Sequence, residues 1–170
     1  MHLVRDALPA TRGGAALSSA AVCLGSRYRG DDAVGPLAAD RLRCAGATVL
    51  ECAEEPTRLL ELWVDFDTVV VVDALRSGAA PGTLHRVDVG GGPLPRELRL
   101  ASSHALGIAD ALELGRTLGR APRRVVVLGL EGGSFGIGDE LTPEVEAGLD
   151  GLVAAALAEL GEEAMCTSVP

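Results

Sequence analysis

Short apolar runs and amphipathic segments alternate along the chain. Apolar runs rich in β-branched residues are typical of buried strands, and four are predicted, at 20–25, 48–52, 68–72 and 124–130. A fifth segment, 83–89, alternates apolar and polar side chains and predicts a strand with one exposed side. The unbroken Thr-Val-Val-Val-Val run at 68–72 is the strongest strand signal and is predicted to be the central parallel strand.

Segments with helical spacing lie between most of these strands. Helices are predicted to start near Asp32, after Pro56, at Ser102-Ser103-His104 and after Thr142, with Pro143 in the first turn of the last one. Asp31 or Asp32 is expected to cap the first helix, and Thr142 the last. The link between the third and fourth strands is too short for a crossover helix, so the fourth strand is predicted to be antiparallel, at or near an edge. This order predicts one α/β domain of three layers.

Composition narrows the class of protein. The chain has 170 residues, of which 48% are hydrophobic, and its net charge of −9 disfavours nucleic acid and anionic membranes as partners. No stretch approaches the roughly 20 apolar residues of a membrane span. The four cysteines form no CxxC pair, which favours reduced thiols and a cytoplasmic protein. We expect a poorly ordered leader (1–19), a single domain (20–161) and a frayed C-terminus (162–170).

Acidic and imidazole side chains follow the predicted strands. Asp31 and Asp32 follow the first strand, Asp73 follows the third, and His104 opens the helix before the last strand. The carboxyl ends of parallel strands meet at one edge of a sheet, where ligands bind, so these side chains are expected to converge. Carboxylates and an imidazole suit a divalent metal site or general acid–base chemistry.

Each of these residues also has a structural interpretation. Asp32 is a favoured type of helix cap. Asp73 could accept hydrogen bonds from nearby backbone in a turn, and His104 could cap or pack a helix. Asp31 is expected to be solvated or to act as a second cap. Residue type alone leaves these alternatives open.

Two other site types are weakly supported. Gly25, Gly30 and Gly35 do not form a G-x-G-x-x-G pattern, no Gly-Lys-Ser/Thr follows them, and two acids at the helix start would repel phosphate. Ser134 lies in a Gly-x-Ser-x-Gly sequence, but the next predicted helix waits until Thr142 and no histidine follows. A dinucleotide site and a serine nucleophile are therefore disfavoured.

Several motifs resemble those of one family. The segment 25–35 resembles the G-N-x-x-x-x-D-[DE]-x-x-G motif that opens the hydrogenase maturation proteases. The resemblance covers about Ala21 to Leu160. Its later blocks are Val72-Asp73-Ala74-Leu75 with Pro81-Gly82-Thr83-Leu84, then Ser103-His104-Ala105-Leu106-Gly107-Ile108, then 124–132 followed by Leu141-Thr142-Pro143-Glu144-Val145.

The resemblance implies a fold, an activity and a site. The fold would be a phosphorylase/hydrolase-like α/β/α sandwich whose mixed five-stranded sheet has an antiparallel fourth strand. The activity would be that of an aspartic-type endopeptidase that removes a C-terminal extension from the large-subunit precursor of a [NiFe] hydrogenase. Asp32, Asp73 and His104 would bind nickel already held by that precursor. From the donor set alone, two carboxylates and one imidazole are expected to accept other divalent cations as well, and the protein is expected to be a monomer. Asp32 or Asp73 would be the general base.

Two segments depart from the family pattern, and two alternative functions stay open. Ser26 stands where the family has Asn, and Cys52-Ala53-Glu54-Glu55 stands where it has a Gly-rich stretch. The first alternative is a metal-checkpoint or chaperone module for hydrogenase assembly that cuts nothing. The second is a peptidase of the same fold that acts on another precursor.

Overall fold

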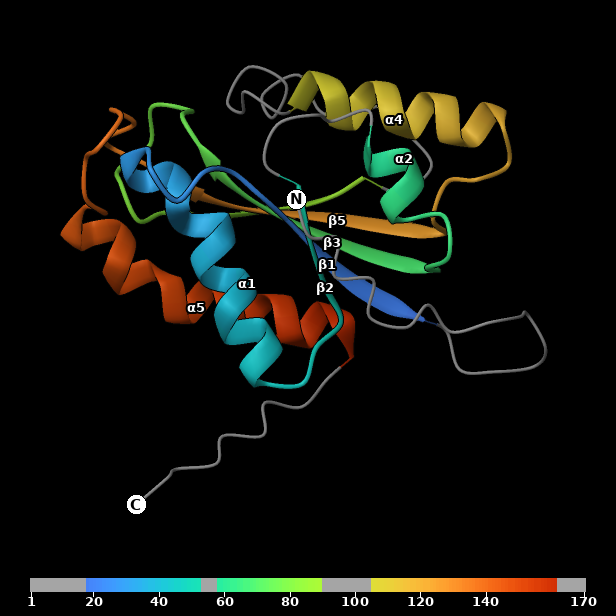
Figure 1. Cartoon of the computed structure of the whole chain (residues 1–170), viewed down its shortest axis with the longest axis horizontal. Coiled ribbons are helices and arrows are strands. Elements are labelled where there is room, and N and C mark those ends of the chain that lie inside the picture. Colours follow the sequence, from blue (N-terminus) through green and yellow to red (C-terminus); the bar gives the residue numbers. More distant parts are fainter. Residues whose placement is uncertain (1–17, 53–57, 90–104, 162–170) are drawn as a thin grey trace, which may run out of the picture.

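A five-stranded sheet with helices on both faces forms the protein (Figure 1). The computed structural model describes residues 18–52, 58–89 and 105–161. The strands are β1 (Ser19–Leu24), β2 (Val49–Cys52), β3 (Thr68–Leu75), β4 (Leu84–Asp88) and β5 (Arg124–Glu131). The helices are η1 (Gly30–Ala33), α1 (Val34–Cys44), α2 (Leu59–Leu62), α4 (Ala105–Thr117) and α5 (Pro143–Leu160).

The strand order is β2-β1-β3-β5-β4, with β3 in the centre. All neighbours are parallel except β4, which lies antiparallel to β5 at one edge. Helices α1 and α5 cover one face, and α2 and α4 cover the other (Figure 1). The predicted fold class, the central position of β3 and the antiparallel edge strand are all confirmed. Within the described ranges, no helix is long and apolar enough to cross a membrane.

Two strands are longer than predicted. We expected the third strand to end at Val72 and the fifth at Leu130, but β3 continues to Leu75 and β5 to Glu131. The two strands pair along this extension, with Asp73 opposite Gly129 and Leu75 opposite Glu131. The polar residues that looked like the start of loops are therefore the last residues of buried strands.

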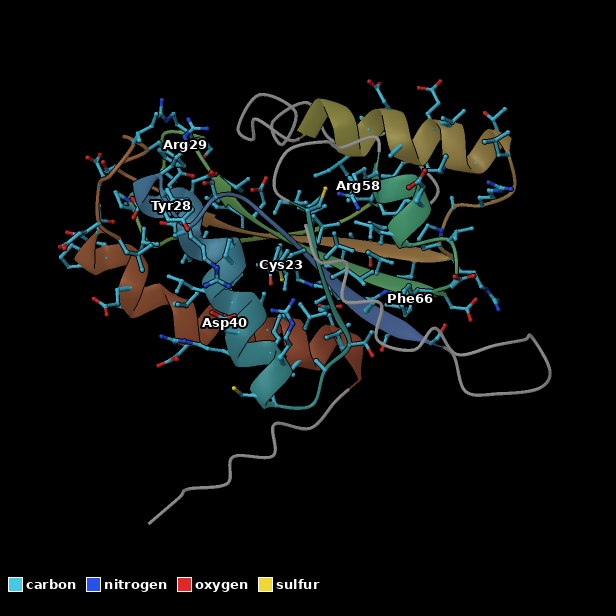
Figure 2. All side chains as sticks on the ribbon, viewed as in Figure 1. Cys23, Tyr28, Arg29, Asp40, Arg58 and Phe66 are labelled. Atoms are coloured by element: carbon cyan, nitrogen blue, oxygen red, sulfur yellow. The ribbon has the colours of Figure 1, made fainter. Side chains whose placement is uncertain are left out.

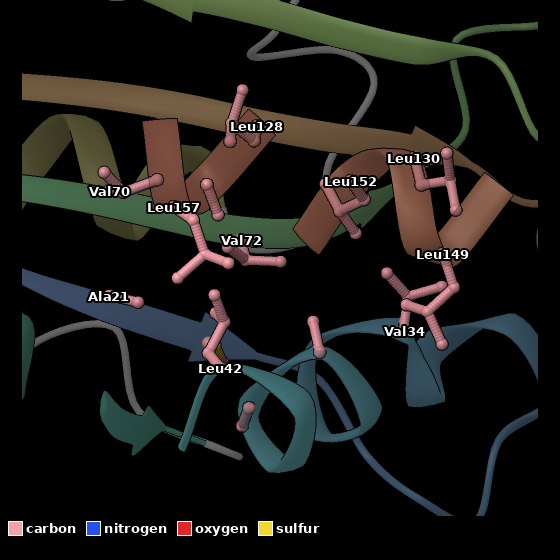
Figure 3. Close-up of a cluster of buried hydrophobic side chains, with 14 of the residues drawn as sticks. Ala21, Val34, Leu42, Val70, Val72, Leu128, Leu130, Leu149, Leu152 and Leu157 are labelled. Atoms are coloured by element: carbon pink, nitrogen blue, oxygen red, sulfur yellow. The ribbon is translucent and has the colours of Figure 1, made fainter. Parts of the chain in front are cut away.

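Aliphatic side chains fill both layers. On the α1/α5 side, alternate residues of β3 and β5 such as Val70, Val72 and Leu128 meet Leu42 of α1 and Leu152 of α5 (Figure 3). The opposite layer holds the other strand residues together with α2, α4 and the fully buried Trp63. Burial of this kind supplies most of the favourable free energy of folding.

Two glycines bring η1 and the start of α1 directly onto the end of β1. Gly25 has a φ of +115°, and a Cβ there would lie 2.1 Å from the carbonyl oxygen of Asp32. A Cβ on Gly35 would lie 1.8 Å from the carbonyl oxygen of Leu24. Neither position has room for a side chain, so these glycines fix where Asp32 sits relative to the strand.

Candidate active site

The carboxyl ends of β1, β3 and β5 and the N-terminal ends of α1, α4 and α5 lie at one edge of the sheet (Figure 1). Figure 2 shows Tyr28 and Arg29 at this end of the molecule and Phe66 toward the opposite end. Register places Cys23 of β1 beside Val72 of β3, so the chain leaves β1 next to Asp73. The predicted location of Asp31, Asp32 and Asp73 at this edge of the sheet is confirmed.

Asp32 lies in η1 with only 7% of its surface exposed. Its Oδ2 accepts a hydrogen bond of 2.9 Å from the backbone N–H of Ser26. The predicted capping role is wrong, because neither η1 nor α1 has a side-chain cap. The side chain turns back toward the loop after β1. Since Ser26 contributes its backbone amide, this contact does not require the Asn that the family has there.

Asp73 is fully buried near the carboxyl end of β3. Its Oδ1 accepts a hydrogen bond of 2.9 Å from the N–H of Ala74. Its neighbours at alternate positions, Val71 and Leu75, belong to the layer that α2 and α4 cover. Strand alternation therefore places Asp73 on the face that carries α4.

His104, the third predicted ligand, lies outside the described residues, as does the Ala53-Glu54-Glu55 segment. Helix α4 begins at Ala105, the next residue along the chain, at the same edge as Asp73 (Figure 1). Among the described residues, no group of three or more His, Cys, Asp or Glu side chains could hold a metal ion. The site of Asp32, Asp73 and His104 stays a prediction.

Asp31 has a structural role that the sequence did not indicate. It is fully buried, and its Oδ2 accepts hydrogen bonds from the N–H groups of Gly133 (2.7 Å) and Ser134 (2.8 Å). Its Oδ1 accepts the N–H of Thr142 at 2.7 Å, and the Thr142 hydroxyl also donates to Asp31. The expectation of a solvated or capping Asp31 is wrong: this carboxylate ties η1 to the loop between β5 and α5. Thr142 occupies the N-cap position of α5 as predicted, but makes no side-chain cap bond to that helix.

Glu131 is a buried acid one residue beyond the predicted end of the last strand. It ends β5 with 1% of its surface exposed. Its carboxylate accepts hydrogen bonds from the Ser77 hydroxyl (2.7 Å) and the N–H of Gly78 (2.8 Å), and His85 Nε2 lies 3.4 Å away. Glu131 thereby holds the loop between β3 and β4 that follows Asp73. A glutamate directly after a buried apolar run is the signal that could have identified it.

Ser134 does not have the surroundings of a nucleophile. Its hydroxyl bonds the carboxylate of Asp139, and its backbone N–H is held by Asp31. The helix that follows starts only at Pro143, so the strand–turn–helix geometry of a nucleophile elbow is missing. The structure agrees with the prediction that Ser134 is not a nucleophile.

Comparisons with known proteins identify the family. Residues 38–159 match the sequence model of the hydrogenase maturation protease family HycI. The structure is similar to that of the hydrogenase maturating endopeptidase HybD from E. coli, with a TM-score of 0.72 at 24% identity over 85% of this chain and 92% of that one. It is also similar to the [NiFe] hydrogenase maturation protease HybD from Thermococcus kodakarensis, with a TM-score of 0.69 at 26% identity over 83% of this chain and 97% of that one. Comparison with curated protein sequences found no match. The family match covers well over half of the chain, which therefore belongs to the hydrogenase maturation proteases.

Proposed function

We propose that this protein is an endopeptidase that removes a C-terminal extension from the nickel-loaded precursor of a [NiFe] hydrogenase large subunit. The observation that carries the proposal is the family match over residues 38–159, a span that includes Asp73 and His104 and begins shortly after Asp32. The name of a similar solved structure, a [NiFe] hydrogenase maturation protease, supports the class of substrate.

Asp32, Asp73 and His104 contact nickel that the precursor already holds. The metal is therefore part of the substrate and not a cofactor of this protein. Carboxylate oxygen and imidazole nitrogen are suitable donors for a divalent transition metal. The geometry of Asp32 supports this role, because Oδ2 is held by Ser26 while Oδ1 accepts no hydrogen bond from the described part of the chain. The low exposure of Asp32 and Asp73 strengthens their attraction for a cation, since water screens buried charges less.

Contact with nickel holds the end of the precursor at this edge of the sheet. One of the two carboxylates, Asp32 or Asp73, takes a proton from a water molecule whose oxygen attacks the carbonyl carbon of the scissile peptide bond. The tetrahedral intermediate then collapses, the C–N bond breaks, and the protonated carboxyl group returns its proton to the leaving amine. The products are the shortened subunit and the released extension, and the protein is regenerated unchanged.

The test is the processing of purified precursor by wild-type protein and by Asp73→Asn, followed by mass spectrometry of the precursor. We expect the wild type to shorten the nickel-loaded precursor and leave the nickel-free one intact, and Asp73→Asn to be slower by at least about 100-fold. Asp150→Asn is the matched control, because the Asp150 side chain is 89% exposed on α5, and it should process normally.

Three results would contradict the proposal or its site. Undiminished cleavage by Asp73→Asn would remove Asp73 from the mechanism. Tight binding of the nickel-loaded precursor by the wild type without loss of a tail peptide would favour the metal-checkpoint function. Equal cleavage of nickel-loaded and nickel-free precursor would show that the metal is not recognised.

A further inference from the structure

Two loops at the edge of the candidate site display large apolar side chains. Tyr28, between β1 and η1, is 77% exposed, and Ile137, between β5 and α5, is 87% exposed. Among the large hydrophobic side chains of the described residues, these two are the most exposed. Single exposed apolar residues are common on protein surfaces, so the case depends on what holds these two and what lies beside them.

Backbone hydrogen bonds join the two loops. The N–H of Gly138, next to Ile137, donates to the carbonyl oxygen of Tyr28 at 2.8 Å. The N–H of Gly30 donates to the carbonyl oxygen of Asp139 at 3.2 Å. These bonds place Tyr28 and Ile137 side by side, although more than 100 residues separate them in the sequence. In Figure 1 the same two segments run together at the carboxyl edge of the sheet.

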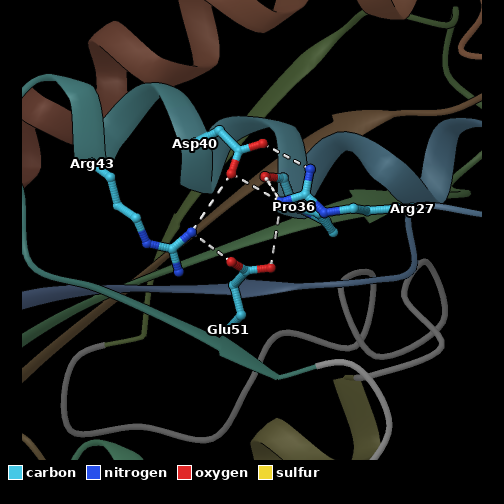
Figure 4. Close-up of polar contacts among 5 residues, drawn as sticks. All are labelled: Arg27, Pro36, Asp40, Arg43 and Glu51. Carbon is cyan, nitrogen blue, oxygen red and sulfur yellow. Dashed lines mark hydrogen bonds and ion pairs between the residues drawn. The ribbon is translucent and has the colours of Figure 1, made fainter. Parts of the chain in front are cut away.

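Side-chain contacts also hold both loops, the one after β1 through Arg27 and the one after β5 through Phe135. Arg27 bonds both carboxylate oxygens of Asp40 on α1, at 2.7 and 2.9 Å, and donates to the carbonyl oxygen of Pro36 (Figure 4). Glu51 of β2 lies 3.7 Å from the Arg27 guanidinium. On the other flank, the guanidinium of Arg76 lies 4.5 Å from the ring centre of Phe135. The backbone beneath Tyr28 and Ile137 is thus held in place while their side chains face solvent.

A cation adjoins these apolar side chains. Arg29 is exposed and makes no ion pair with any residue that the structure describes, in a chain of net charge −9. Its neighbour Arg27, by contrast, is engaged with Asp40. We call Tyr28, Arg29 and Ile137 the rim patch. Aromatic residues and arginine are the types most enriched among the residues that dominate binding energy at interfaces.

We propose that the rim patch docks the folded body of the hydrogenase precursor. The matching surface of the precursor would have an apolar depression that receives Tyr28 and Ile137, with an acidic side chain beside it that pairs with Arg29. This inference rests on the proposed function, because the precursor is the substrate named there. Tyr28 lies four positions before Asp32, so a protein held by the rim patch would have its neighbouring surface at the candidate site.

The shape of the patch favours a folded partner over the flexible extension that is removed. Protruding anchor side chains gain affinity by filling preformed pockets, which a folded surface has and a short flexible tail does not. The loops that carry the rim patch are already fixed, so they lose little conformational entropy on binding. A folded partner also avoids the entropy cost of ordering, which a flexible tail would have to meet. Arg29 would then steer and orient the acidic side of that partner.

The experiment compares wild type with the double variant Tyr28→Ala/Ile137→Ala, in steady-state processing of nickel-loaded precursor. We expect KM to rise about tenfold or more while kcat stays within about twofold, since both side chains lie outside the proposed chemistry. Leu114→Ala/Leu118→Ala is the matched control. Leu114, near the end of α4, and Leu118, just after that helix, are 50% and 53% exposed, and their loss should change neither constant. Arg29→Ala should raise KM several-fold and reduce its dependence on salt.

Competition identifies the part of the precursor that binds. Mature subunit without its tail should inhibit wild-type processing and should inhibit the double variant at least about tenfold less well. A synthetic tail peptide should not compete. Inhibition by the tail peptide but not by the mature subunit, or an unchanged KM in the double variant, would overturn the rim-patch proposal. Failure of the wild type to process any precursor would instead contradict the proposed function.

Discussion

Asp31 and Asp32 are neighbours in the sequence and both are buried at the same edge of the sheet, yet their surroundings differ. The Asp31 carboxylate accepts hydrogen bonds from the backbone amides of Gly133, Ser134 and Thr142 and from the Thr142 hydroxyl. The Asp32 carboxylate accepts one, from the amide of Ser26.

The difference separates a structural acid from a candidate for chemistry. A carboxylate whose oxygens are already bonded to backbone amides has little capacity for another ligand, and it stabilises the segments that supply those amides. A buried carboxylate with one oxygen outside such bonds is able to meet a cation or a water molecule. The number of fixed donors around each acid therefore predicts whether its loss affects folding or activity.

The largest expected effect is that of Asp31→Ala. Three backbone amides and a hydroxyl lose their acceptor in a buried region, and we expect the free energy of unfolding to fall by about 3–5 kcal/mol. Asp32→Ala removes one hydrogen bond and should lower the free energy of unfolding by about 1 kcal/mol. The same variant should abolish precursor processing. Urea denaturation of the two variants measures the difference. Equal loss of stability in both would contradict the distinction between the two acids.

The next effect tests the glycine that holds η1 and Asp32 against β1. A Cβ on Gly35 would lie 1.8 Å from the carbonyl oxygen of Leu24, so Gly35→Ala must push α1 away from the strand. We expect the free energy of unfolding to fall by about 2–3 kcal/mol, with loss of processing by the remaining folded protein. Gly151→Ala in α5 is the matched control, because a Cβ there meets nothing within 4 Å. Helix propensity predicts that Gly151→Ala stabilises by up to about 1 kcal/mol. If Gly35→Ala left the free energy of unfolding unchanged, the close packing of Gly35 against Leu24 would be contradicted.

The order of elements could be predicted from the sequence, but two strand ends could not. The valine-rich run of β3 and the alternating pattern of β4 are local signals, and both strands lie where predicted. The ends of β3 and β5 depend on each other, since Leu75 pairs with Glu131. An acid such as Asp73 resembles the start of a loop until the neighbouring strand is known to continue beside it.

The location of Asp31, Asp32 and Asp73 at one edge of the sheet could be predicted from the sequence, but the different surroundings of Asp31 and Asp32 could not. Asp31 and Asp32 have the same side chain, and only the approach of Gly133 and Thr142, more than 100 residues further along, decides which one is anchored. Such contacts leave no local trace in the sequence. The rim patch was missed for the same reason, because nothing in the sequence indicates that Tyr28 and Ile137 lie side by side.

The smallest effect concerns a partly exposed acid, Glu159, which arginines hold at the opposite end of the strands. Hydrogen bonds from Arg86 (2.5 Å), and then from Arg124, lower the pKa of Glu159 on α5 below its ordinary value. Because the pKa is lower in the folded state, the stabilisation is complete above the ordinary pKa of about 4.5 and is lost as pH falls through the folded value. Glu159→Gln should therefore be less stable than wild type by at most about 1 kcal/mol at neutral pH. Urea denaturation at a series of pH values down to about 3 should show this gap closing, whereas a gap that stayed constant or widened in acid would mean that the ion pairs do not stabilise the fold.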